Sequence, residues 1–392
     1  MQYAPVTTRL ARLGSDKWVL SAAANARRLA GQEVINLTIG EPDVPTPDTL
    51  IAAASRAMQA GRTGYSNGRG EATLLRALSK RYSTSTGREI GIDRFLCLPG
   101  TQTSLYLVFM ALCEPGCEVI VGDPLYATYE GLIRASGATP VPVMLSPEHD
   151  FRLQASAVEE KITSSTRAIL LNTPHNPTGA VLTPADLDAI CALAEQHDLW
   201  VISDEVYGDL THGAAVFTSA LANPAYEHRV ITTASISKSH AAPGFRSGWL
   251  CGPAEFCTRA LPLSETMLFG SQPFIADMTA EAIANPPTLA HAMAARMANR
   301  AAIIQGALDG VAGMRVHRPE AGMFALLDIR ALSTDSQRFA LDLLESTGVA
   351  AMPGASFGVA LEGWLRLALN ASDADTAEAC RRIAEFAMRV RT

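Results

Sequence analysis

Short runs of consecutive apolar residues alternate with longer stretches of helical spacing between about residues 70 and 250. Continuous apolarity over four to six residues is typical of strands buried on both faces in a parallel sheet. The stretches between them, such as Pro184–His197 after the candidate N-cap Thr183, predict crossover helices. The pattern therefore predicts an α/β fold with a mostly parallel sheet flanked by helices. The predicted strands are Phe95–Leu98, Glu118–Val121, Ala168–Leu171, Leu199–Ile202, Val230–Thr232 and Trp249–Cys251.

The pattern changes beyond about residue 277. An Ala-rich stretch of helical spacing runs to Leu308, and strand-like pieces follow at Met323–Ile329 and Trp364–Leu369 before a closing helix begins at Asp373. We expect a second, smaller α+β domain here. The sequence thus predicts a large domain over residues 48–276 and a small domain that combines residues 1–47 with residues 277–392.

Composition and charge narrow the class of protein. The 392 residues are 48% hydrophobic and 18% charged, which excludes a disordered chain or a coiled coil. A net charge of −7 gives no general attraction to nucleic acid or to anionic membrane. No apolar run approaches the roughly 18 residues of a membrane span, and the first residues lack the layout of a signal peptide. The seven cysteines are too scattered for a zinc site or a disulfide framework. We expect a cytoplasmic protein without a metal.

One motif match fails on its missing partner. Gly354-Ala-Ser-Phe-Gly358 fits the G-x-S-x-G pattern of α/β-hydrolases, which need a catalytic histidine downstream of the serine. The last histidine of this chain is His317, before Ser356. This order excludes the hydrolase interpretation.

Five polar segments follow or interrupt the predicted strands. Leu98–Ser104 passes from a strand into a helix, whose N-terminus suits a phosphate. Asn172–Gly179 and Ser203–Tyr207 come after buried strands, at the carboxyl edge where open α/β sheets bind ligands. Asp204 in the latter segment needs a cation or a donor there, although a helix N-cap also fits it.

The other two segments carry buried cations. In Ser235–Gly248, Lys238 follows a buried strand and Arg246 comes eight residues later. A lysine in an apolar pocket has a lowered pKa and can act as an amine nucleophile. Arg366 lies inside the apolar strand Trp364–Ala368, where it needs an anion, and a carboxylate matches its fork. A phosphate cup, an acid, an amine and a carboxylate clamp are what pyridoxal phosphate bound to an amino acid requires.

From Ile39-Gly-Glu-Pro-Asp43 to Arg366 the chain resembles the fold-type-I, class I/II aminotransferases. The resemblance implies pyridoxal 5′-phosphate as cofactor and transfer of the α-amino group of an L-amino acid to a 2-oxo acid such as pyruvate. It places Lys238 at the position of the Schiff-base lysine, which also carries the substrate's proton. It implies that Asp204 keeps the ring nitrogen protonated.

The resemblance also implies the remaining contacts. The implied cofactor-binding residues besides Asp204 and Lys238 are Gly100, Thr101, Gln102, Tyr126, Asn176, Tyr207, Ser235, Ser237 and Arg246. Tyr207, with Lys238 and Asp204, is counted as catalytic. The implied substrate-binding residues are Gly40, Asn176 and Arg366. Tyr65 matches a tyrosine that reaches the neighbouring subunit's phosphate, so a homodimer with shared active sites is expected. Ordinary packing also fits Tyr65 and Tyr126.

Departures from the family bear on the substrate. Gln102 stands where an aspartate-specific subgroup has a lysine, and Leu263–Ala276, which supplies a partner arginine in another subgroup, has none and carries Glu265. We therefore expect a neutral or cationic amino donor. Thr173–Pro177, His197–Trp200 and Ser237–His240 are similar to arginine:pyruvate transaminases, which makes arginine a candidate. A C–S β-lyase on the same scaffold is the alternative.

Overall fold

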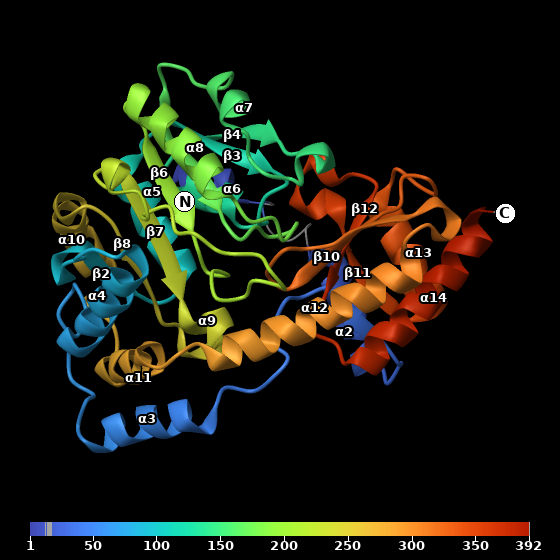
Figure 1. The fold of residues 1–392 in the computed structure, drawn as a ribbon, viewed down its shortest axis with the longest axis horizontal. Helices are drawn as coiled ribbons and strands as arrows, with labels where there is room; N and C mark the ends of the chain where they lie inside the picture. Colours follow the sequence, from blue (N-terminus) through green and yellow to red (C-terminus); the bar gives the residue numbers. More distant parts are fainter. Residues whose placement is uncertain (12, 14–17, 392) are drawn as a thin grey trace.

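The computed structural model describes residues 1–11, 13 and 18–391, which form two sheets with their helices (Figure 1). In spatial order the larger sheet contains β2 (Phe95–Leu98), β8 (Gly248–Cys251), β7 (Val230–Ser235), β6 (Trp200–Asp204), β5 (Thr166–Asn172), β3 (Glu118–Asp123) and β4 (Thr139–Met144). β8 pairs antiparallel with both of its neighbours, and the other neighbouring pairs are parallel. The predicted α/β fold with a mostly parallel sheet is confirmed.

Each predicted apolar run of this sheet forms a strand, but β4 was not predicted. Its sequence Thr-Pro-Val-Pro-Val-Met carries two prolines, and its side chains are largely exposed or half-buried. Proline lacks the N–H that a central strand must donate, so it is confined to edges. β4 is the edge strand beside β3. An exposed edge does not need the continuous apolarity by which the central strands were found.

Helices cover both faces of the larger sheet. One face packs against α4 (Ala72–Thr86), α8 (Pro184–Gln196) and α11 (Pro273–Ala284), with α3 (Asp48–Gln59) outside α11 and α7 (Ala155–Glu159) beside α8. The other face packs against α5 (Thr101–Leu112), α6 (Tyr129–Ala135) and α10 (Ala254–Leu268). The prediction at Thr183 is confirmed, because its side chain forms a capping box with Asp186 at the start of α8.

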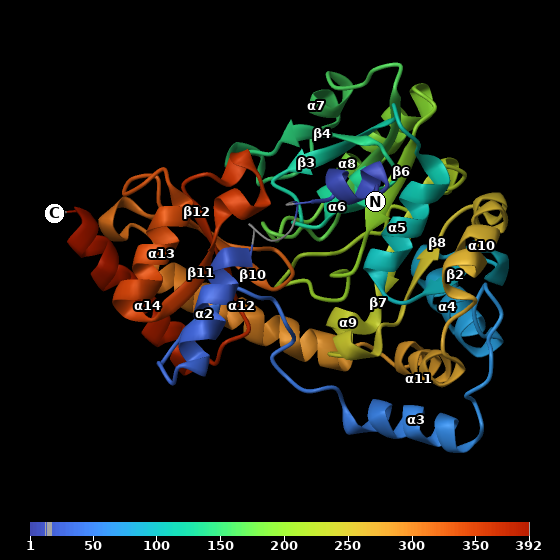
Figure 2. The same cartoon turned by 180° about the vertical axis from the view of Figure 1, so that it is seen from behind.

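The smaller sheet and its helices form the end of the molecule away from the larger sheet, at the left in Figure 2. Its order is β1 (Ile35–Leu37), β11 (Val349–Pro353), β12 (Trp364–Ala368), β10 (Phe324–Asp328) and β9 (Arg315–His317). It packs with α2 (Val19–Leu29), α12 (Thr288–Leu308), α13 (Ser336–Thr347) and α14 (Asp373–Arg391). The parallel pairing of β1 with β11 brings N-terminal residues into this C-terminal part.

The first helix lies elsewhere. α1 (Pro5–Arg9) packs on α6 of the larger part, where Arg9 Nε donates to the Arg134 carbonyl oxygen at 2.6 Å. The domain boundaries between residues 47 and 48 and between residues 276 and 277 stay predictions.

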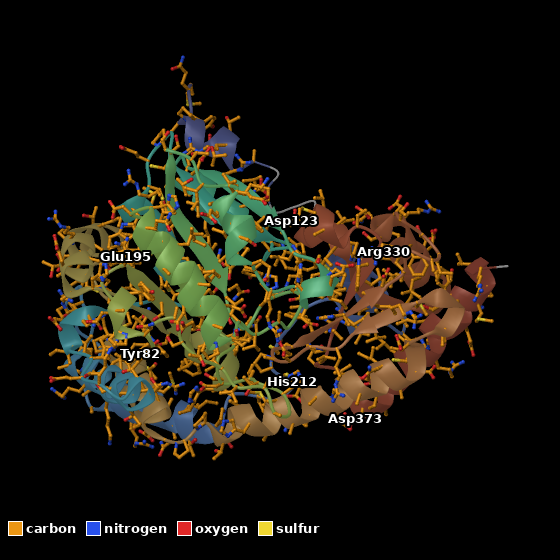
Figure 3. All side chains as sticks on the ribbon, turned by 45° about the horizontal axis from the view of Figure 1, so that its top comes forward. Tyr82, Asp123, Glu195, His212, Arg330 and Asp373 are labelled. Carbon is orange, nitrogen blue, oxygen red and sulfur yellow. The ribbon has the colours of Figure 1, made fainter. Side chains whose placement is uncertain are left out.

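Two buried carboxylates hold segments near the site in place. Asp43 binds both Arg296 and Arg300 of α12, with N–O distances of 2.7 and 2.8 Å. Asp123, labelled in Figure 3 at the junction of the two parts, accepts from the backbone N–H groups of Val359 and Ala360 at 3.2 Å each. These contacts hold the segments after β1 and after β3 against the smaller sheet.

All seven cysteines lie in the described ranges, where they are buried and form no disulfide. None of the described helices is long and apolar enough to cross a membrane.

Candidate active site

A cavity of about 310 Å³ lies where the carboxyl ends of β5, β6 and β7 face β10 and β12 of the smaller sheet. It brings together all but two of the predicted site residues. Those on its wall are Gly40, Thr101, Gln102, Tyr126, Asn176, Asp204, Tyr207, Ser235, Ser237, Lys238, Arg246 and Arg366. The two exceptions are Gly100, whose backbone packs against the Arg246 guanidinium, and Tyr65.

Lys238 presents its amine inside this cavity. It lies on α9 (Ile236–Ser239), the short helix that follows β7, and its Nζ donates to the Gly40 carbonyl oxygen at 2.7 Å. Burial lowers the pKa of Lys238 to about 8, against a raising influence of Glu41 and with further lowering by Arg366 and Arg246. A substantial fraction of the amine is therefore neutral near pH 8 and able to attack a carbonyl.

Asp204 presents a carboxylate at the end of β6. The Tyr129 hydroxyl donates to its Oδ2 at 2.7 Å, and the Val206 N–H donates to its Oδ1 at 3.2 Å. Burial raises the pKa of Asp204 to about 6, although both hydrogen bonds lower it. No helix begins here, since turns follow β6. The N-cap interpretation of Asp204 is therefore wrong.

Tyr129 is a site residue that the sequence analysis missed. It is buried at the first turn of α6, and its ring packs edge-to-face on Tyr126 with a centroid distance of 5.4 Å. The available signal was the spacing Tyr126-x-x-Tyr129 after the carboxyl end of β3, in a turn closed by the Tyr129 N–H, which donates to the Tyr126 carbonyl oxygen at 2.9 Å.

The start of α5 forms a cup suited to a phosphate. Gly100 has φ +87°, and a Cβ on it would stand 2.5 Å from the Arg246 guanidinium, so the backbone and this cation pack directly on each other. The buried Thr101 hydroxyl has no hydrogen-bond partner among the described residues. Ser235 and Ser237 add two hydroxyls to the cavity wall, and Ser235 pairs across the sheet with Gly248, which packs on Gly100. Free N–H groups, hydroxyls and a guanidinium are the donors that a phosphate takes.

Arg366 lies on β12 with its guanidinium buried between two aromatic rings. Its Cζ is 3.8 Å from the Phe324 ring centroid and 4.2 Å from that of Phe357. One terminal nitrogen donates to Asn176 Oδ1 at 3.1 Å and the other to the Thr38 carbonyl oxygen at 2.6 Å. Burial lowers the pKa of Arg366. These neighbours offset part of its charge but include no carboxylate, so the cation suits an anionic ligand.

The G-x-S-x-G match has a structural explanation. Gly358 has φ +141°, and a Cβ there would collide with the Asp123 carboxylate that accepts from the next two N–H groups. The Leu125 N–H donates to the Phe357 carbonyl oxygen at 2.8 Å. The Gly354–Gly358 loop therefore contacts the segment before Tyr126 through its backbone and places the Phe357 ring over Arg366.

Tyr207 and Asn176 lie side by side on the wall. Burial raises the pKa of Tyr207 well above its usual value, and a hydrogen bond with Asn176 opposes that rise. Asn172 holds the Asn176 segment, because its Oδ1 accepts from the Asn176 N–H at 2.8 Å. Both side chains thus present polar groups to the same part of the cavity.

Tyr65 and Glu265, which the sequence analysis linked to the partner subunit and to substrate choice, lie outside the cavity of their own chain. Tyr65 is 91% exposed and packs edge-to-face on Phe269, which is 66% exposed. Glu265 is exposed too, with its side chain against the Gly68 backbone. Neither residue therefore contributes to the site within one chain.

The chain is similar to known proteins over nearly its full length. The family described as aminotransferase class I and II matches residues 32–383. The arginine–pyruvate transaminase of Pseudomonas aeruginosa is 40% identical over 385 residues, which cover 98% of each chain. An aspartate/prephenate aminotransferase of Cereibacter sphaeroides is 32% identical over 94% of this chain and 95% of its own. The solved aspartate aminotransferase of Thermus thermophilus with maleate superposes with a TM-score of 0.91, at 29% identity, over 98% of this chain and 100% of its own.

Proposed function

This chain belongs to the class I and II aminotransferase family and is an aminotransferase, and we propose that its cofactor is pyridoxal 5′-phosphate. The proposed reaction moves the α-amino group of a neutral or cationic L-amino acid to pyruvate or a similar 2-oxo acid. The observation that carries the proposal is the buried Lys238 amine, which shares one cavity with the Asp204 carboxylate and the Arg366 guanidinium. The aminotransferases named above give no support to a C–S β-lyase.

The polar groups of the cavity fit this cofactor. The cup of Gly100, Thr101, Ser235, Ser237 and Arg246 would hold the phosphate. The buried Thr101 hydroxyl, which has no partner in the described part of the chain, would donate to it. Tyr126 would stack on the ring, while Tyr207 and Asn176 would bind the phenolic oxygen. When bound, the cofactor supplies an aldehyde for the amino group and a ring that takes up electrons from the substrate's Cα.

Asp204, Lys238 and Arg366 would each have a separate role in the reaction. Asp204 would keep a proton on the ring nitrogen, because a buried carboxylate without an ion-pair partner in the described ranges is stabilised by a cation. Lys238 would take the proton from the substrate's Cα and deliver it to the aldehyde carbon of the cofactor, C4′, for which a pKa of about 8 is well suited. Arg366 and the Gly40 backbone bind the α-carboxylate, which fixes the substrate in the cavity.

For the donor we propose arginine as the leading candidate among neutral and cationic amino acids. The arginine–pyruvate transaminase likeness over nearly the full length supports it. The described cations on the cavity wall are Lys238, Arg246 and Arg366, and each already has a role, so none is left for a second carboxylate. Glu41 is a carboxylate on the same wall, and it favours a cationic side chain.

A donor screen tests this proposal. We expect arginine and alanine to convert the aldehyde form of the cofactor to its amine form, which absorbs at shorter wavelength, and pyruvate to reverse the change. Aspartate as the best donor by tenfold or more in kcat/KM would contradict the charge argument. Release of ammonia with return of the aldehyde form would instead indicate lyase chemistry.

We also propose a cytoplasmic homodimer that shares its active sites. The exposed Tyr65 and Phe269 pair lies in a surface hollow, outside its own chain's cavity, and large exposed aromatic pairs are typical of interfaces. Sedimentation should give twice the mass of one chain. In a hybrid of one Tyr65→Phe subunit with one Lys238→Ala subunit, shared sites would leave one site intact and put both substitutions in the other. If Tyr65 served only its own chain, each site would carry one of the two substitutions, which would contradict the proposal.

A further inference from the structure

The Asp204 carboxylate depends on hydrogen bonds rather than on a salt bridge. No Lys, Arg or His in the described part of the chain forms an ion pair with it. Its two oxygens accept from the Tyr129 hydroxyl at 2.7 Å and from the Val206 N–H at 3.2 Å. The shorter bond, from Tyr129, comes from a side chain 75 residues away in the sequence. This side chain is therefore the main local support of the charged form of Asp204.

Tyr129 is held so that its hydroxyl can reach only a small region. Its ring is 2% exposed within the apolar cluster of α5, α6 and α10, and it packs edge-to-face on Tyr126 at 83°. Burial and the charge of Asp204 raise the pKa of Tyr129 well above its usual value, so the phenol stays protonated and is the donor. The contact thus has a fixed direction, from hydroxyl to carboxylate.

We propose that Tyr129 is a positioning residue that orients the Asp204 carboxylate and keeps it charged for the ring nitrogen of the cofactor. The inference rests on the proposed use of pyridoxal phosphate. Without the hydroxyl, Asp204 would lose its shorter hydrogen bond in a buried site and would take up a proton more readily. A neutral Asp204 no longer attracts the ring N–H⁺, so the effect of Tyr129 must act through that nitrogen.

The test compares Tyr129→Phe with the wild type in binding two cofactors. One is pyridoxal 5′-phosphate, and the other is its 1-deaza analogue, which has C–H in place of the ring nitrogen. Tyr82→Phe is the matched control, since Tyr82 is also buried and bonds Trp249 Nε1 at 2.9 Å, but lies in the cluster on the opposite face of the sheet. The dissociation constants come from fluorescence titration of the apoenzymes.

We expect the wild type and Tyr82→Phe to share one preference for the natural cofactor over the analogue, and Tyr129→Phe to lose about tenfold of it. The preference is a ratio measured on one variant, so partial unfolding cancels from it. Tyr129→His, which keeps a ring and an N–H donor, should lose less of the preference than Tyr129→Phe, and the reverse order would count against the inference.

The outcomes separate this inference from the proposed function. An unchanged preference in Tyr129→Phe, with normal binding by the wild type, would overturn the role of Tyr129 and leave the cofactor assignment standing. A wild type that binds neither molecule would overturn the proposed function and this inference with it.

Discussion

Replacing Gly100 by alanine tests the phosphate cup at its tightest contact. Gly100 has φ +87° and ψ 165°, a backbone conformation that costs another residue about 1–3 kcal/mol. The new Cβ would stand 2.5 Å from Arg246 Nη2 and 3.0 Å from its Cζ, so the guanidinium must move. If Arg246 binds the phosphate, its displacement removes a hydrogen bond to a charged group, worth about 1.5–3 kcal/mol. The dissociation constant of the cofactor should therefore rise roughly tenfold to a hundredfold.

The assay is a fluorescence titration of each apoenzyme with pyridoxal phosphate, together with thermal unfolding in its absence. The matched control is Gly87→Ala at the end of α4, where φ is +70° and a Cβ would meet nothing within 4 Å. That variant should lose about 1–2 kcal/mol of stability and keep its affinity for the cofactor. Affinity within twofold of the wild type in Gly100→Ala would refute Arg246 as a phosphate ligand. An equal loss in both variants would show that backbone strain alone weakens binding.

Two further predictions concern the substrate clamp and the amine. Phe357→Leu removes a ring face 4.2 Å from the buried Arg366 guanidinium, so KM for donor and acceptor should rise between three- and thirtyfold with little change in kcat. Phe339→Leu is the control, because its buried ring packs on Phe386 and is not one of the two rings over Arg366, and it should change neither constant. A fall in kcat alone in Phe357→Leu would contradict the reasoning. The rate at which apoenzyme captures the cofactor covalently should rise with pH to about 8 and then level off, because the lowered pKa of Lys238 leaves the amine neutral above that point; a rise that continues to about pH 10 would indicate an ordinary lysine.

The central strands could be predicted because burial on both faces demands continuous apolarity, as in Ala168–Leu171. The edge strand β4 lacks this demand, and the antiparallel direction of β8 depends on a chain reversal that no local pattern records. The carboxyl ends of β5, β6 and β7 meet at one edge, which is why polar residues after three separate runs predicted a single site.

The missed parts of the site are contacts between distant segments. The Tyr129–Asp204 hydrogen bond and the packing of Gly100 on Arg246 join residues 75 and 146 positions apart, and neither residue type reveals its partner. The two rings around Arg366 come from different elements, one of them inside the motif that resembled a hydrolase elbow. Tyr65 stays a prediction, because its proposed partner is in a second chain.

The central claim is that Lys238 is the residue to which the cofactor attaches. The sequence contains only four lysines, at positions 17, 80, 161 and 238, so the assignment can be made cleanly. The most direct measurement is borohydride reduction of the holoenzyme, followed by proteolysis and mass spectrometry of the peptides. We predict one pyridoxyl group per chain on Lys238 and none in Lys238→Ala. The control Lys161→Ala should carry the same label on Lys238 as the wild type. A pyridoxyl group on Lys80 or Lys161, or an unlabelled Lys238 in active enzyme, would contradict the account.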